Sequence, residues 1–214
     1  DFFTGRDPRG GNVATTINPE VQQAAWDAME DGCNGPCKGS VVALEPSTGK
    51  ILAMVSAPSY DPNLLASHNI DEQAKTWQSL RDNPDSPLLN RAISETYPPG
   101  STFKVVTTSA ALGAGVVGAN DTVSCPGVAS VDGRTIPNED EFALGQVSMG
   151  TAFARSCNTS FAFLGAKLKP EALNTAAAEL GIGPDYAIAG LPVSSGQYPL
   201  PKAMVNQVED SFGQ

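Results

Sequence analysis

Two apolar runs in the first third of the chain constrain its fold more than any other feature of the sequence. They cover residues 40–44 and 51–55, and the turn between them contains Pro46 and Gly49. Two short apolar runs joined by such a turn predict a β-hairpin. Because both faces of each run are apolar, we expect strands that other parts of the fold bury on both sides.

The residues before the hairpin predict a strand followed by a helix. The short run 13–17 favours the strand. Asn18 then provides an N-cap and Pro19 a suitable first helical residue, after which apolar residues recur at helical spacing until Gly32. We therefore expect a helix that begins at Pro19 and stops at Gly32.

The remainder of the chain predicts mainly helices separated by irregular segments. Residues 58–97 are rich in Pro, Asn and Asp and favour loops with one short helix, while residues 116–142 favour turns. Helices are expected over 101–112, on both sides of 156–158, and over 170–180. With 214 residues, of which 41% are hydrophobic, the chain can build one good core, or one large and one small subdomain.

Charge and hydropathy argue against two classes of function. The net charge of −10 argues against a nucleic-acid partner, because phosphate contacts need clustered Lys and Arg. No apolar run approaches the length of a membrane span. We therefore expect a globular domain that binds no nucleic acid.

The four cysteines predict one local disulfide. Cys33 and Cys37 are four residues apart with a Gly and a Pro between them, so a bridge is sterically possible. Two free thiols or a metal site are the alternatives, but the other potential ligands lie far away in the sequence. We expect the bridge to form in an oxidising compartment, while Cys125 and Cys157 stay reduced and Cys157 packs as a small apolar side chain.

The single histidine excludes the most familiar serine-enzyme triad. His68 lies in a polar segment with no evident partner, and a solvated loop residue explains it best. A serine enzyme built on this chain needs another base, and lysine is the usual alternative. Ser101 and Lys104 provide such a pair, because residues three apart share one face of a helix.

The surroundings of Ser101 favour that pair. A helix that starts at Ser101 places free backbone N–H groups and partial positive charge beside its hydroxyl, and apolar neighbours lower the pKa of Lys104. Ser47 and Lys50 have the same spacing, but they lie in the hairpin turn, where lysine is solvated. The sequence therefore predicts Ser101 as nucleophile and Lys104 as its base.

A second polar cluster lies at Ser156, Cys157 and Asn158. In an extended loop Ser156 and Asn158 can point into one cleft, the first to relay a proton and the second to bind a substrate amide. On spacing alone, Ser156 could instead be the N-cap of the next helix. Residues 67–69 also fit the same three-letter pattern.

Residues 97–104, Tyr-Pro-Pro-Gly-Ser-Thr-Phe-Lys, resemble the active-site serine motif of penicillin-binding proteins. Residues 156–159 look like the second motif of that family. Other segments match it in order, namely 15–17, 42–49, 60–63 and 90–92. The resemblance runs from about Gly11 to Gln214 and is closest to class B members of the family.

The resemblance implies an α/β fold of the serine transpeptidase (β-lactamase and penicillin-binding protein-like) type, an antiparallel sheet flanked by helices. This chain would hold the helical part and two or three strands. The implied function is a D,D-transpeptidase that cross-links peptidoglycan stem peptides through an acyl-enzyme on Ser101, without a cofactor or a metal. Lys104 would be the base, Ser156 the proton relay and Asn158 an amide-binding group, and β-lactams would acylate Ser101.

Three other functions fit the same motifs. A D,D-carboxypeptidase uses water as the acceptor, a β-lactam sensor binds the drug without turnover, and a bifunctional enzyme adds a glycosyltransferase upstream. The context of residues 97–104 favours a synthase over a sensor. Only analysis of the products separates a transpeptidase from a carboxypeptidase.

The family's third motif, K-T-G, does not occur in these 214 residues. We therefore expect residues 1–12 to be a linker from a preceding region and 13–214 to be the N-terminal and helical part of a transpeptidase domain. A downstream segment that carries K-T-G and the remaining strands should complete it. The resemblance further implies an N-terminal membrane anchor, a location on the extracytoplasmic face of the bacterial plasma membrane, and cell-division or elongation machinery as partners.

Overall fold

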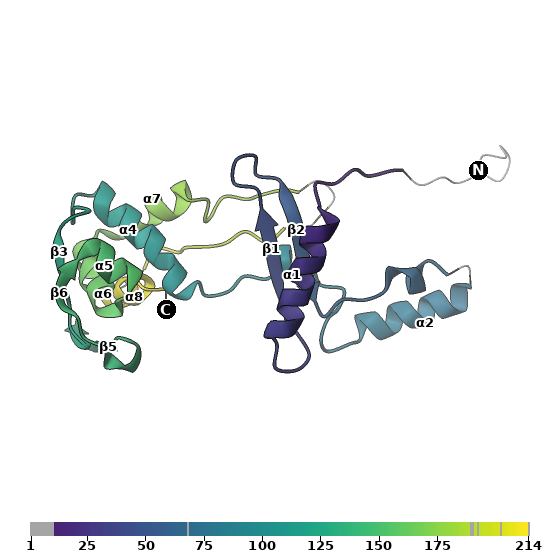
Figure 1. Cartoon of the computed structure of the whole chain (residues 1–214), viewed down its shortest axis with the longest axis horizontal. Helices are drawn as coiled ribbons and strands as arrows, with labels where there is room; N and C mark the ends of the chain where they lie inside the picture. The colour runs from purple at the N-terminus through teal and green to yellow at the C-terminus, as the bar shows by residue number, and fades with distance from the viewer. Residues whose placement is uncertain (1–10, 68, 189–190, 192, 202, 214) are drawn as a thin grey trace. The chain divides into compact units, whose positions relative to one another are not determined.

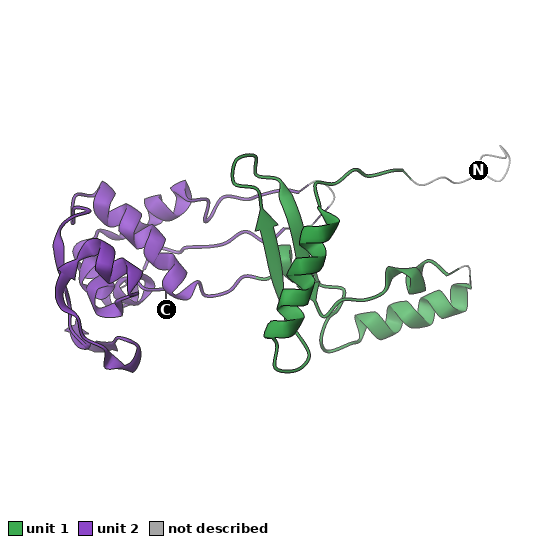
Figure 2. Ribbon diagram, in the orientation of Figure 1, with its two compact units in different colours: residues 1–95 green, residues 96–214 purple. Residues whose placement is uncertain are grey.

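The computed structural model describes residues 11–67, 69–188, 191, 193–201 and 203–213. It divides the chain into two compact units, residues 1–95 and 96–214 (Figure 2). The described elements of the first unit are α1 (Pro19–Gly32), β1 (Gly39–Leu44), β2 (Ile51–Ala57), the 3-10 helix η1 (Pro62–Leu65), α2 (Ile70–Arg81) and α3 (Arg91–Ser94). The predicted linker falls largely on residues 1–10, which lie outside the described residues.

The predicted hairpin is confirmed as the antiparallel pair β1–β2, in which Val41 faces Val55. Helix α1 packs against it (Figure 1), and alternate residues of β2 are buried. Burial on both sides is not found among the described residues, because Val42 and Leu44 of β1 remain 43% and 57% exposed. The hairpin therefore keeps an apolar surface that the described part of the chain does not cover.

The predicted strand at 13–17 is wrong. The structure has no strand there, and side chains bond to the backbone of β2 instead. The Thr16 hydroxyl donates to the carbonyl of Ile51 at 2.7 Å, and the Gln22 amide bonds to both the N–H and the carbonyl of Met54. The backbone also reaches β2 at Asn18, whose N–H donates to the Leu52 carbonyl at 2.9 Å, but residues 13–17 form no strand pairing with β2.

Helix α1 begins and ends where the sequence predicts. The Asn18 side chain accepts hydrogen bonds from the N–H groups of Glu20 and Val21, which have no acceptor within the helix. After Gly32, a disulfide joins Cys33 and Cys37 with their Cα atoms 5.5 Å apart, the pairing that their spacing predicts.

The segment 58–97 is more helical than predicted. Helix α2 has twelve residues, and the side chain of its N-cap, Asn69, accepts hydrogen bonds from the backbone N–H groups of Asp71 and Glu72. The polar composition of the segment obscured this start signal. The prediction of a solvated His68 lies outside the described residues.

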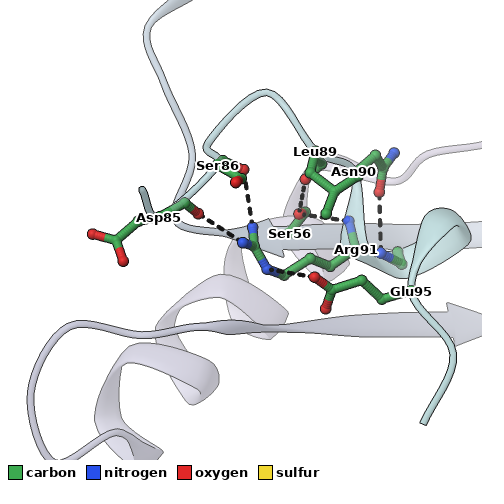
Figure 3. A network of polar contacts seen from close by, with 8 residues as sticks. Ser56, Asp85, Ser86, Leu89, Asn90, Arg91 and Glu95 are labelled. Carbon is green, nitrogen blue, oxygen red and sulfur yellow. Dashed lines mark hydrogen bonds and ion pairs between the residues drawn. The ribbon is translucent and has the colours of Figure 1, made fainter. Parts of the chain in front are cut away.

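The segment before the second unit is held by a buried arginine (Figure 3). The Arg91 guanidinium donates to the carbonyls of Asp85 and Ser86, at 2.7 and 3.3 Å, and its Nε lies 3.5 Å from a Glu95 oxygen. The Ser56 hydroxyl accepts the N–H of Arg91 and donates to the carbonyl of Leu89, which ties this loop to β2. Residues 90–92, which resemble a segment of the penicillin-binding proteins, thus hold this loop against β2.

The second unit carries the predicted site. Its described elements are the 3-10 helix η2 (Gly100–Phe103), α4 (Lys104–Gly113), β3 (Thr122–Cys125), β4 (Val128–Val131), β5 (Arg134–Pro137), the 3-10 helix η3 (Glu139–Glu141), β6 (Gly145–Ser148), α5 (Met149–Ala154), α6 (Asn158–Lys167), α7 (Pro170–Glu179) and α8 (Met204–Asp210). The helices predicted around 156–158 and over 170–180 are confirmed. None of the described helices has the length and apolar character that crossing a membrane requires.

Residues 116–142 form strands where turns were predicted. Strand β3 pairs with β6 and β4 pairs with β5, both antiparallel. Each strand has only four residues, which is too short for alternation to be recognised in the sequence. The β4–β5 turn uses Asp132 and Gly133, both with positive φ, as a tight hairpin requires.

The core of the second unit lies between its helices. Phe103, Val106 and Phe161 from the two site-bearing segments pack with Leu173 of α7 and Val208 of α8. This packing brings α4 and α6 together, and with them the residues that the sequence singles out.

Candidate active site

Ser101 lies in a tight turn rather than at the start of an α-helix. Gly100 has a φ of +56°, residues Gly100–Phe103 form a 3-10 helix, and α4 begins only at Lys104. Side chains three residues apart are eclipsed on a 3-10 helix, so this geometry aligns Ser101 and Lys104 more closely than an α-helix does. The Ser101 side chain is exposed, whereas Lys104 is only 2% exposed.

The Lys104 ammonium lies at the centre of the site. It donates to Ser101 Oγ at 3.1 Å, to Ser156 Oγ at 2.9 Å and to Asn158 Oδ1 at 2.6 Å. It also contacts the Ser156 carbonyl at 2.8 Å and lies 5.4 Å from the centre of the Phe161 ring. Burial lowers the pKa of Lys104 to about 8, since no carboxylate among the described residues contacts it to offset the loss of water.

Ser156 and Asn158 reach the site from the junction of two helices. After α5 ends, Ser156 adopts a φ of +55°, Cys157 takes the N-cap position and Asn158 is the first residue of α6. Ser156 Oγ donates to Ser101 Oγ at 2.9 Å, and Asn158 Nδ2 donates to the Pro137 carbonyl at 3.2 Å. The alternative role for Ser156, an N-cap of the next helix, is therefore wrong.

The four predicted residues thus form one connected cluster, in which Ser101 Oγ contacts both the buried amine and a second hydroxyl. The second S-x-x-K match is not part of it, because Ser47 and Lys50 are exposed in the β1–β2 turn. Within the described ranges, no group of three His, Cys, Asp or Glu side chains could hold a metal ion.

The expectation that Cys125 and Cys157 stay reduced is wrong. A disulfide joins them, with Cα atoms 6.2 Å apart and both side chains fully buried. The two residues are 32 positions apart, so only the packing of β3 against the α5–α6 region brings their thiols together. The bridge fastens the residue between Ser156 and Asn158 to the end of a strand.

Asn138 is a supporting residue that sequence reasoning missed. Its Oδ1 accepts the N–H of Thr159 at 3.1 Å, while its Nδ2 donates to the carbonyls of Pro126 and Phe142. It therefore caps the first turn of α6 from a distant loop and fixes the start of the helix that carries Asn158. No local signal reveals this role, because the two partners are 21 residues apart.

Comparison with known proteins identifies the family of this chain. The family model of the penicillin-binding protein transpeptidase domain matches residues 39–214. The chain belongs to this family. It is 62% identical over 186 residues, 85% of this chain and 38% of the relative, to the peptidoglycan D,D-transpeptidase PbpA of Mycolicibacterium smegmatis. The chain thus spans well under half the length of this curated relative.

Solved structures of penicillin-binding proteins agree with this assignment. The penicillin G acyl-enzyme complex of penicillin-binding protein A from M. tuberculosis matches all of this chain and 50% of its own, with a TM-score of 0.89 and 53% identity. A structure of a peptidoglycan synthase complex matches 92% of this chain and 38% of its own, with a TM-score of 0.78 and 32% identity. The predicted serine transpeptidase fold and the resemblance to the penicillin-binding protein A type are confirmed.

Proposed function

We propose that this chain forms the nucleophile-bearing part of a D,D-transpeptidase that cross-links peptidoglycan stem peptides. The observation that carries the proposal is the contact of one buried amine, Lys104 Nζ, with Ser101 Oγ and Ser156 Oγ together. A serine needs an adjacent base to become nucleophilic, and an amine with a pKa of about 8 is partly neutral near pH 7. The D,D-transpeptidase activity named for the mycobacterial relative supports the same reaction.

Acylation begins with neutral Lys104. Its Nζ takes the proton from Ser101 Oγ, and the oxygen attacks the carbonyl carbon of the D-Ala–D-Ala peptide bond. As the C–N bond breaks, the proton passes from Lys104 through Ser156 to the leaving nitrogen, and D-Ala departs as an amine. The N–H of Ser101, in the first turn of η2, is available to bind the developing oxyanion.

Transfer to the acceptor reverses these roles. An amine of a second stem peptide attacks the ester carbonyl and loses its proton towards Lys104, and Ser101 Oγ regains a proton as the ester breaks. Asn158 Nδ2 carries two N–H groups and donates one of them to the Pro137 carbonyl, so the other can bind the substrate backbone. A β-lactam acylates Ser101 in the same way, but its leaving nitrogen stays tethered.

Three further parts of the proposal concern the protein beyond this chain. A downstream segment carrying K-T-G completes the site and the sheet, which the exposed Val42 and Leu44 of β1 support. The two disulfides support an oxidising, extracytoplasmic location. The N-terminal membrane anchor rests on the family resemblance alone. The match to a peptidoglycan synthase complex supports assembly with another component of peptidoglycan synthesis, and we propose the cell-division or elongation machinery as its source.

The test is incubation of the full-length protein with benzylpenicillin, followed by mass spectrometry of its peptides. We expect one penicilloyl adduct, on Ser101. Ser101→Ala should abolish the adduct, while Ser47→Ala, at the second match to the motif, should retain it. An adduct that persists in Ser101→Ala, or that maps elsewhere, contradicts the assignment.

Product analysis then separates the reaction classes. With stem pentapeptide and an amine acceptor, a transpeptidase yields the cross-linked product with release of D-Ala. Release of D-Ala without cross-links indicates a carboxypeptidase, and acylation without turnover of peptide indicates a sensor.

A further inference from the structure

The last described residues of the chain contact both helices of the candidate active site. Ser211, which follows α8, is fully buried and lies between α4 and α6. Its carbonyl accepts a hydrogen bond of 2.8 Å from the Thr107 hydroxyl of α4. Its own hydroxyl lies 2.9 Å from the Phe161 carbonyl of α6 and 2.6 Å from the Val208 carbonyl of α8. One residue therefore links the helix that carries Lys104 to the helix that carries Asn158.

The Thr107 bond is not the usual one for a helical threonine. A threonine hydroxyl inside a helix commonly bonds to the carbonyl four residues earlier, as Thr108 does to Lys104 at 2.7 Å. Thr107 lies 3.5 Å from the corresponding carbonyl of Phe103 and makes its short bond to Ser211 instead. The Thr107 hydroxyl thus donates to the carbonyl of Ser211, the C-cap of α8, which receives no N–H donor from within that helix.

The contacts of Ser211 with Thr107 and Phe161 lie about one helical turn beyond the active-site contact between the same two helices. Thr107 follows Lys104 by three residues on α4, and Phe161 follows Asn158 by three residues on α6. Lys104 and Asn158 meet directly at 2.6 Å, so a small change in the separation of the two helices changes this contact first. The spacing at the site is therefore coupled to the spacing at Ser211.

Close packing and hydrogen bonds hold α8 against α6 at a fixed distance. A Cβ on Gly165 of α6 would lie 2.5 Å from the Cβ of Ser211, so only glycine permits this approach. The Gln207 side chain of α8 donates to the carbonyls of Gly165 and Leu168 at 2.7 and 2.6 Å, which anchors α8 to the end of α6. Interiors packed in this way transmit displacements instead of absorbing them.

We propose that Thr107 and Ser211 are positioning residues that set the distance between the Lys104 amine and the Ser156–Asn158 turn. The inference rests on the proposed function, since the distance matters only if Lys104 activates Ser101. Neither residue touches the reacting atoms, and both act through the helices that carry them. Losing the link lets α4 and α6 shift, and a displacement of about 1 Å at a catalytic group lowers the rate steeply.

The test compares two threonines of the same helix in the full-length protein. Stopped-flow acylation by the chromogenic β-lactam nitrocefin gives the acylation rate constant and the dissociation constant of the noncovalent complex separately. Thr107→Val, which keeps the shape and removes the hydroxyl, should lower the rate constant about tenfold or more with the dissociation constant changed less than about threefold. Thr107→Ser should restore it, and Thr108→Val should stay within about twofold of the wild type.

Each other outcome counts against a particular proposal. A wild-type protein that nitrocefin does not acylate refutes the proposed function. A wild type that is acylated, with Thr107→Val equally fast, refutes the positioning role alone, as does a Thr107→Ser that is as slow as Thr107→Val. If Thr107→Val does not fold, Ser211→Ala removes the hydroxyl on the other side of the link, and an unchanged rate constant in that variant overturns the inference.

Discussion

Nζ of Lys104 lies 2.6 Å from Oδ1 of Asn158, closer than to the hydroxyl it is proposed to activate. The partner is a neutral amide, so it orients the amine without adding a negative charge. A carboxylate in its place would favour the protonated form of Lys104. The amide therefore keeps the lysine aligned while burial alone lowers its pKa to about 8.

Asn158→Asp should raise the pKa of Lys104 by about one unit or more, because an opposite charge in contact favours the ammonium. The fraction of neutral Lys104 at pH 7 then falls, and acylation by benzylpenicillin at that pH should slow about tenfold or more. The pH profile of acylation should move to higher pH. Asn158→Ala removes the amide without adding a charge and should leave the position of the profile near or below that of the wild type. Equal pH profiles of acylation for the wild type and Asn158→Asp would show that a neutral partner at this position is not needed to keep the pKa of Lys104 low.

The wild-type acylation rate should itself depend on pH through Lys104. Since its pKa is about 8, the rate should rise about tenfold per pH unit below that value and level off above it. The unfolded chain keeps the ordinary pKa of 10.5, so between about 8 and 10.5 it binds more protons than the folded protein. The contribution of Lys104 to the free energy of unfolding therefore rises with pH across that window. A rate profile flat from pH 6 to 9 would contradict this assignment.

Lys104→Arg should fold but acylate at least ~100-fold more slowly, because a guanidinium does not lose its proton at working pH and cannot act as a base. The matched control is Lys50→Arg, at the other S-x-x-K match, which should acylate at the wild-type rate. Rate constants for both variants come from the same benzylpenicillin assay. Near-normal acylation by Lys104→Arg would mean that the residue provides only positive charge.

The residues that the sequence predicts are those whose relation is local. Ser101 and Lys104 are three positions apart, and Ser156 and Asn158 two, so helix and loop geometry place each pair without knowledge of the fold. How the pairs meet, 52 to 55 positions apart in the chain, came from family resemblance, because tertiary packing decides it.

Contacts between distant segments account for most of what was missed. Cys125 and Cys157 each look like a small buried apolar residue, and nothing in their spacing indicates a bond. Asn138 is a polar residue in a turn-rich stretch until the fold brings it to Thr159. The strand expected at 13–17 is the opposite case, because the local pattern was plausible but the side chains of Thr16 and Gln22, and not a strand pairing, join this part of the chain to β2.

The Cys125–Cys157 bridge should stabilise the protein more than the Cys33–Cys37 bridge. The first closes a loop of 32 positions and the second a loop of 4, which corresponds to about 4 and about 2 kcal/mol of loop entropy in the unfolded chain. Denaturant unfolding of Cys125→Ala/Cys157→Ala and Cys33→Ala/Cys37→Ala measures both. Only the first pair should also slow acylation, because Cys157 separates two residues of the site.

Titration of thiols gives an independent check of both bridges. The denatured, unreduced protein should show no free thiol, since all four cysteines are paired. Two free thiols, together with unchanged acylation in Cys125→Ala/Cys157→Ala, would contradict a Cys125–Cys157 bridge that supports the site.

Gly213→Ala should disturb the turn that presents Ser101. The Gly213 carbonyl accepts the N–H of Gly100 at 3.1 Å, and a Cβ on Gly213 would overlap the carbonyl group of Gly100. The atoms that this Cβ would overlap belong to the Gly100 backbone, so no side-chain rotation can relieve the overlap. We expect a loss of stability of about 2 kcal/mol or more and at least ~10-fold slower acylation by benzylpenicillin.

The backbone conformation of Gly213 contributes a second effect, which the control separates. Gly213 has a φ of +87°, where any alanine is strained, and Gly133 in the β4–β5 turn has a φ of +77° with nothing within 4 Å of its Cβ position. Gly133→Ala therefore measures the strain alone, about 1 kcal/mol, and should leave acylation unchanged. The difference between the two variants, measured by denaturant unfolding and by acylation rate, is the effect of the contact with Gly100. Equal losses of stability with normal acylation in both would show that Gly213 is required for its φ only and does not hold the Ser101 turn.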